Sequence, residues 1–120
     1  MHNYPWIENY CLSLLGTEMD YKVEWSATRF MVCGKMFAMQ GGDKSGKLIL
    51  SLKLKPENGL ILREKYPEVI PGYYLNKTHW NSIYLEGTVP DDVLKMMISE
   101  SYDLIYNALT KKQKESLKPI

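Results

Sequence analysis

The 120-residue chain has no long hydrophobic run and almost no net charge. Its apolar stretches are a few residues long, whereas a helix that crosses a bilayer needs about 20 apolar residues. We therefore expect no membrane span, and no signal peptide because the first residues lack a basic stretch followed by an apolar one. A content of 45% hydrophobic residues with a net charge of +1 excludes disorder for the body of the chain. These properties predict one cytoplasmic domain.

Cysteine and histidine are also scarce, with two residues of each. Cys11 and Cys33 have no CxxC spacing and no nearby histidine cluster, whereas a zinc site takes about four protein ligands, or three and a water. We therefore expect two reduced, metal-free cysteines that act as small buried hydrophobic side chains. No metal site and no cofactor is predicted.

The small net charge hides an uneven distribution along the chain. Residues 22–55 contain seven Lys and Arg against two carboxylates, a charge of +5, and residues 104–120 carry +3. Between them, residues 86–103 contain five carboxylates against one lysine, a charge of −4. Such a chain can bind a polyanion through one surface, although lysines on exposed strands also protect a sheet from aggregation. The sequence leaves both explanations open.

Hydrophobic periodicity predicts the order helix, four strands, helix, two strands, helix. Apolar residues three and four positions apart lie between Asn3 and Gly16, and the period changes to two from Tyr21. Pro56 and Pro90 each suit the first turn of a later helix. The expected ranges are helices at 3–15, 56–66 and 90–109, and strands at 21–25, 29–33, 35–39, 48–54, 73–75 and 81–86.

The connections between the first four strands are short, which predicts antiparallel pairing. Gly34-Lys35 is a candidate tight turn, and the glycine-rich segment 41–47 is a candidate flexible hairpin tip. Parallel neighbours would need crossovers of about a dozen residues, and residues 20–55 leave no room for them. We therefore predict an α+β fold with a single antiparallel sheet covered by helices.

Enzyme motifs are missing from the sequence. It contains no GxSxG, GxxxxGK[ST], HExxH or GxGxxG pattern, so no catalytic residue is predicted. The segment 41–47 superficially resembles a phosphate-binding loop, but a strand is expected where a helix is required. Two acidic pairs on the last predicted helix, Asp91-Asp92 and Glu100/Asp103, could bind a divalent metal, but a solvated helix face is the favoured interpretation.

The densest polar and aromatic cluster is 73–81, with a lysine, a histidine, amides and large rings in nine residues. Such a mixture can stack on bases and bind phosphates, or it can pack beneath a helix with its polar ends hydrogen-bonded locally. We predict that Trp80 lies in the core and that Lys77 and His79 lie at the surface.

The chain resembles a known family in seven ordered motifs between about residue 4 and residue 114. They are Cys11–Thr17, Gly34–Ala38, Leu62–Pro67, Ile70–Tyr73, Asn76–Asn81, Pro90–Asp92, and Ser101–Ile105 followed by Lys111-Lys112. In these motifs the chain is similar to the MmcQ/YjbR family of small bacterial proteins. It departs from the family at Leu15, where a proline is usual, and over Val23–Thr28, where the family has an acidic, Phe-rich turn.

This resemblance implies a compact α+β fold like those of CyaY-type and secretion-chaperone-type domains. It implies a single domain over 1–114, with 115–120 as a short C-terminal tail. It also implies a role as a double-wing DNA-binding protein, and it implies no catalytic residues and no particular reaction.

Three functions remain open, and the first is non-enzymatic DNA binding in which two hairpins act as wings. The phosphates would be contacted by six basic residues, Lys44, Lys47, Lys77, His79, Lys111 and Lys112. With two arginines in the chain, we expect weak binding with little sequence selectivity. The alternative is a protein- or peptide-interaction module with an exposed sheet face that carries Met31, Met36 and Met39. The third is an enzyme that acts on a small molecule, with His79 near Glu86. For all three functions we expect the protein to be a monomer.

Overall fold

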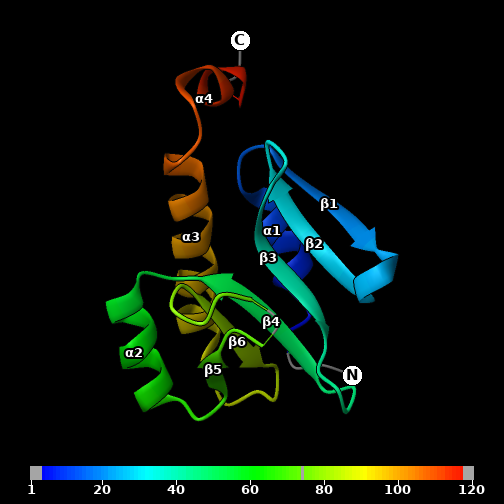
Figure 1. Cartoon of the computed structure of the whole chain (residues 1–120), viewed down its shortest axis with the longest axis vertical. Coiled ribbons are helices and arrows are strands. Elements are labelled where there is room, and N and C mark those ends of the chain that lie inside the picture. Colours follow the sequence, from blue (N-terminus) through cyan, green and yellow to red (C-terminus); the bar gives the residue numbers. More distant parts are fainter. Residues whose placement is uncertain (1–3, 74, 118–120) are drawn as a thin grey trace.

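A computed structural model describes residues 4–73 and 75–117, and in these residues the chain forms one six-stranded sheet and four α-helices (Figure 1). The elements are α1 (Ile7–Ser13), β1 (Thr17–Lys22), the 3-10 helix η1 (Val23–Trp25), β2 (Ala27–Val32), β3 (Lys35–Gly42), β4 (Leu48–Lys53), α2 (Pro56–Lys65), β5 (Val69–Pro71), β6 (Trp80–Tyr84), α3 (Asp91–Asn107) and α4 (Lys111–Leu117). Among the described residues, no helix is long and apolar enough to cross a membrane.

The sheet has the strand order β1-β2-β3-β4-β6-β5, and every neighbouring pair is antiparallel. The prediction of an α+β fold with a single antiparallel sheet is therefore confirmed. The helices gather on one side, and Figure 1 shows α1 and α3 behind the strands. We call this side of the sheet the covered face and the opposite side the open face.

The core lies between the covered face and the helices. Phe37 and Tyr102 meet edge to face with ring centroids 5.3 Å apart, which packs β3 against α3. The hydroxyl of Ser101 donates to the Phe37 carbonyl and accepts from the Lys53 amide, so it ties α3 to two strands. The other fully buried side chains include Phe30, Leu50, Leu52, Ile83, Leu94, Met97 and Ile98.

The first strand begins earlier than predicted. It starts at Thr17, directly after Gly16, whose φ of +72° suits a glycine between a helix and a strand. Residues 23–25, expected to continue the strand, instead form η1, and Ser26 with φ of +49° ends it. Hydrophobic periodicity alone cannot reveal this turn, because the alternation of apolar and polar residues over Tyr21–Trp25 continues past the end of the strand.

The β2–β3 turn also lies one position before the predicted one. Cys33 and Gly34 both have positive φ, +49° and +75°, which is the pattern of a two-residue hairpin turn that matches strand twist. Both cysteines are free. Cys11 is fully buried in the core as predicted, and burial raises the pKa of its thiol to about 12. Cys33 is half-buried.

The predicted strand 73–75 is wrong. The strand lies at Val69–Pro71 instead, where it pairs with β6, and the lack of an amide hydrogen on Pro71 is tolerated at the sheet edge. Tyr73 and Leu75 belong to the connection that follows. Two residues used in the predictions, Tyr74 of this strand and the expected helix cap Asn3, lie outside the described residues.

Helix α4 was not expected. Thr110 and Gln113 form a reciprocal capping box, in which each side chain accepts a hydrogen bond from the other's backbone amide, at 3.1 and 3.0 Å. Lys111 and Lys112 therefore begin a fourth helix rather than end the third, which corrects their predicted placement. Residues 115–117, expected in a tail, belong to α4, and Leu117 packs against the core.

Candidate functional site

A pocket lies on the open face of the sheet, and its floor is built by two rows of cross-strand neighbours. The first row runs Arg29, Met39, Ser51 and Ser82, and the second runs Ala27, Gly41, Ile49 and Tyr84. Residues opposite each other in antiparallel strands project to the same side of the sheet. Met39, Ile49 and Ser51 from these rows are part of the lining of a cavity of about 430 Å³.

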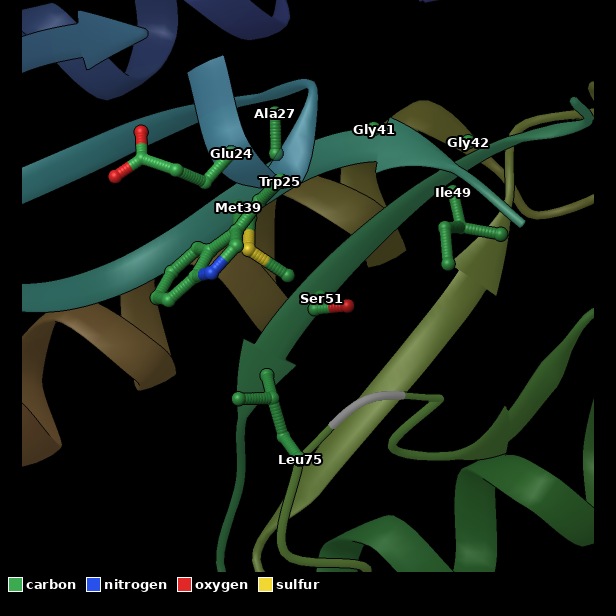
Figure 2. Close-up of a pocket in the computed structure, with 9 residues that line it drawn as sticks. All are labelled: Glu24, Trp25, Ala27, Met39, Gly41, Gly42, Ile49, Ser51 and Leu75. Carbon is green, nitrogen blue, oxygen red and sulfur yellow. The ribbon is translucent and has the colours of Figure 1, made fainter. Parts of the chain in front are cut away.

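Two irregular segments form the walls of this pocket. The 3-10 helix η1 carries Trp25 on one side, and the connection between β5 and β6 carries Leu75 on the other. Figure 2 shows the Trp25 ring beside the sulfur of Met39, with Leu75 across the pocket and Glu24 directed away. The lining is mostly apolar, and Trp25 is 53% exposed. This lining suits an apolar group with few polar contacts.

The first wall depends on small residues in β2 and β3. A Cβ added at Gly41 would lie 3.1 Å from the Cβ of Ala27 and 3.3 Å from the Ser26 carbonyl oxygen. Glycine and alanine at these two opposed positions therefore leave room for the chain to turn at Ser26. The left-handed φ of Ser26 provides that turn and places Trp25 over the sheet.

Charged side chains hold the indole of Trp25 in position. The Lys22 ammonium and the Arg29 guanidinium each lie 5.6 Å from the centre of the ring. Arg29 is itself fixed by two hydrogen bonds to Asp20, at 2.8 and 2.6 Å, and these bonds hold the pKa of Asp20 below its ordinary value. The wall is thus preorganised by contacts that lie outside the pocket.

The second wall is held by a hydrogen-bonded loop. The Asn76 side chain accepts from the amides of Thr78 and His79, and the Lys77 ammonium donates to the Gly72 carbonyl at 2.6 Å. Arg63 of α2 donates to the Lys77 carbonyl at 2.8 Å. The predicted exposure of Lys77 and His79 is confirmed, but the Lys77 ammonium bonds its own loop. Trp80, predicted in the core, is half-buried.

The β3–β4 connection is ordered by one carboxylate. Asp43 accepts hydrogen bonds from the Ser45 hydroxyl, the Ser45 and Lys47 amides, and the Tyr84 hydroxyl. These bonds, led by that of the Ser45 hydroxyl, lower the pKa of Asp43 to about 2. The flexible tip expected from the glycines is therefore a structured turn. It presents exposed Lys44 and Lys47 at one end of the sheet.

The structure does not gather the predicted basic residues on one surface. Lys44 and Lys47 precede β4, whereas Lys77 and His79 lie beside Leu54 beyond its other end, roughly 20 Å away for six strand residues. Lys111 and Lys112 begin α4, at the opposite end of the long axis from the β3–β4 connection (Figure 1). The six residues therefore lie in three separate places rather than in one cluster.

Strand pairing also reduces the positive charge seen along the sequence. Asp20 of β1 pairs with Arg29 of β2, and Glu24 lies 3.6 Å from Lys22. The acidic residue Glu100 has a structural role, because it accepts hydrogen bonds from the Lys55 amide and the Asn58 side chain at the start of α2. Among the described residues, no group of three His, Cys, Asp or Glu could hold a metal ion.

Sequence reasoning missed the pocket and its two walls. Trp25 and Leu75 lie in segments whose irregular backbone no periodic pattern reveals. One signal was available, because Trp25 lies in Val23–Thr28, the stretch that departs from the acidic, Phe-rich turn of the resembled family. Ser51 was not singled out either, and its hydroxyl is hydrogen-bonded to Ser82 at 2.8 Å.

Comparisons with known proteins agree with this fold. The uncharacterized protein YjbR of Escherichia coli K12 is 32% identical over 108 residues, covering 90% of this chain and 91% of that protein. The uncharacterized protein YbdF of Escherichia coli O157:H7 is 31% identical over 90 residues, covering 75% of this chain and 73% of that protein. Neither name specifies a reaction.

Solved structures give the same result. The crystal structure of a Deinococcus radiodurans protein with the domain DUF419 is 32% identical, with a TM-score of 0.84, and the match covers 98% of this chain and 88% of that one. A Pseudomonas syringae protein at 24% identity and a TM-score of 0.71 shares the fold, with 85% and 97% covered. The YjbR family model matches residues 12–104. The chain therefore belongs to the YjbR family.

Proposed function

We propose that the protein is a non-enzymatic binding module that takes an apolar side chain of a partner polypeptide into the pocket between Trp25 and Leu75. The observation that carries this proposal is the pocket itself, about 430 Å³ with a mostly apolar lining on the open face of the sheet. A partner polypeptide fits better than a small molecule because apolar exposure continues past the pocket, with Val23 of η1 73% exposed.

The fixed walls support this proposal. Trp25 is held by Lys22 and Arg29, and the loop that carries Leu75 is held by Asn76 and Lys77. A surface that is ordered before binding loses little conformational freedom when a partner arrives. Exposed tryptophan in such a position is typical of residues that contribute most to binding.

The side chains around the pocket support a role without catalysis. The Ser51 hydroxyl is bonded to Ser82, and Ser82 also accepts from the Tyr73 amide at 3.0 Å. A serine nucleophile needs a neighbouring base, and neither of these bonds provides one. Two free cysteines further support a place in a reducing compartment such as the cytoplasm.

Selection from a phage-displayed library of random peptides tests the proposal. We expect enriched peptides with an apolar residue, and a synthetic copy should bind about tenfold or more weakly to Trp25→Ala in calorimetry. Leu60→Ala is the control, because Leu60 is 63% exposed on α2 and away from the pocket. Failure to enrich any peptide, or equal binding by Trp25→Ala and the wild type, would contradict the proposal.

Double-wing DNA binding is a second candidate, with fewer contacting residues than the sequence analysis predicts. The hairpins β1–β2 and β3–β4 are the wings, and the supporting observation is that Asp43 orders a tip with exposed Lys44 and Lys47. In this form, the log–log salt slope of duplex binding corresponds to about two phosphate contacts rather than one for each of the five predicted lysines. Lys44→Ala and Lys47→Ala should each lower the slope by about one contact, and Lys111→Ala should leave it unchanged. Binding that does not change with salt would exclude this candidate.

A further inference from the structure

The strand β1 is the long exposed edge of the sheet. Among residues 4–73 and 75–117 it pairs with β2 alone, so the other side of its backbone has no strand partner. The opposite edge, β5, is three residues long and ends in Pro71, which blocks further pairing. An exposed edge of six residues such as β1 is a template for another strand.

The side chains of β1 divide cleanly between its two faces. Glu18, Asp20 and Lys22 share the open face, where Asp20 meets Arg29. Met19 and Tyr21 project to the other face and are 43% and 61% exposed. One edge thus offers unpaired backbone groups, exposed apolar side chains and charges of both signs.

We propose that β1 pairs with β1 of a second copy of this chain, antiparallel and about a two-fold axis that passes at Asp20. The six-stranded sheets of the two copies then form one continuous sheet, with both open faces on the same side. Lys22 of this edge also contacts Trp25, but β1 is paired through its backbone and not through the pocket, so the inference does not depend on the proposed function.

Charge complementarity supports a second copy of this chain as the partner of β1. A two-fold axis perpendicular to the sheet places one residue opposite its own copy, and the centre then fixes every other pair. With Asp20 at the centre, Glu18 lies opposite Lys22 of the partner subunit, and Lys22 lies opposite Glu18 of the partner subunit. Met19 lies opposite Tyr21 of the partner subunit, which gives two apolar pairs on the other face.

The centre of this pairing carries two aspartates, but each is already neutralised. Asp20 accepts two hydrogen bonds from Arg29 of its own chain, at 2.8 and 2.6 Å. A centre at Met19 would instead place Glu18 opposite Asp20 twice, which repels. A centre at Tyr21 would limit pairing to three residues of each strand, because β1 ends at Lys22. Asp20 is therefore the centre that the side chains favour.

Sedimentation equilibrium over a concentration series tests this dimer. The paired edge is short, so we expect weak association, with a dissociation constant of roughly 10–100 µM. Glu18→Lys places two lysines opposite each other at both ends of the pairing, and Lys22→Glu places two glutamates there. Each variant alone should self-associate about tenfold more weakly than the wild type.

The mixture of these two variants gives the sharpest result. Each Glu18→Lys chain then faces a Lys22→Glu chain with two opposite-charge pairs, so the mixture should form a heterodimer that is tighter than the homodimer of either variant. Lys35→Glu is the matched control, because it makes the same charge change on β3, away from the edge, and should associate like the wild type. Circular dichroism melting confirms that each variant is folded.

Three results would overturn the inference. The wild type could remain monomeric up to about 1 mM. The single variants could associate as strongly as the wild type, which would place the interface elsewhere. The mixture of the two variants could remain monomeric when each is folded.

Discussion

The two faces of the sheet use the same strands for different purposes. On the covered face, Leu50 and Leu52 of β4 are fully buried against the helices. On the open face, Ile49 and Ser51 of the same strand form the floor of a pocket, and loops form its walls. Side-chain alternation therefore separates the core from the pocket within one strand. Substitutions on the two faces should have correspondingly different effects.

The largest effect on stability is expected on the covered face. Leu52→Ala leaves a cavity beneath the helices, where the surrounding side chains are closely packed, and should lower the free energy of unfolding by about 2–5 kcal/mol. Urea denaturation measures it, with Leu60→Ala as an exposed control expected within about 0.5 kcal/mol of wild type. A small loss in Leu52→Ala would show that the two faces do not differ as described.

A smaller effect on stability is expected in the loop that forms the second wall of the pocket. Lys77→Ala removes the bond from the ammonium to the Gly72 carbonyl and should lower the free energy of unfolding by about 1 kcal/mol. Because this lysine holds its own loop, duplex DNA binding should be unchanged. Lys44→Ala provides the contrast, with unchanged melting and weaker DNA binding. Normal melting of Lys77→Ala with weaker DNA binding would assign Lys77 to the DNA surface.

A still smaller change in stability is expected at the first wall. Trp25 is 53% exposed and lies outside the core, so Trp25→Ala should change the free energy of unfolding by less than about 0.5 kcal/mol. Thermal melting and the peptide calorimetry described above should be measured on the same sample. A large fall in melting temperature would make Trp25 part of the stable core and would weaken the contrast between the faces.

The last effect is expected in the pH dependence of stability, at the β3–β4 turn. The pKa of Asp43 falls from 3.8 to about 2 on folding, so its ionised form stabilises the fold above pH 4. That contribution disappears as the pH falls from about 4 to about 2. Asp43→Asn should therefore show a flatter fall of melting temperature over this range than the wild type. Parallel profiles for the two proteins would contradict this assignment.

The fold was predictable because its elements follow hydrophobic period and turn chemistry. Short links at Cys33-Gly34 and at 43–47 leave antiparallel pairing as the sole geometry for β2, β3 and β4. The buried stripe of α3 was predicted from its three- and four-residue spacing. Helix α4 was missed because its seven residues are mostly polar, and a capping box rather than an apolar stripe marks its start.

The candidate site was largely unpredictable from the sequence. The pocket exists because Ser26 adopts a left-handed conformation and because Ala27 and Gly41 are small and opposed across two strands. Both features depend on pairing between segments that are distant in the sequence, so no local sequence pattern reveals them. The spatial distribution of the predicted basic residues could not be predicted for the same reason. Their spacing along the chain says nothing about which end of β4 each occupies.

The contact between Leu117 and Gly16 has a consequence for the order of folding. A Cβ added at Gly16 would overlap the Leu117 side chain, so residues 101 positions apart touch. Such a contact closes a long loop and cannot form before Leu117 has been synthesised. A seven-residue helix that begins with two lysines, at the end of the helix dipole that disfavours cations, is marginal until it docks. Helix α4 is therefore the last element to join the fold and the first to leave it, at a free energy below that of global unfolding.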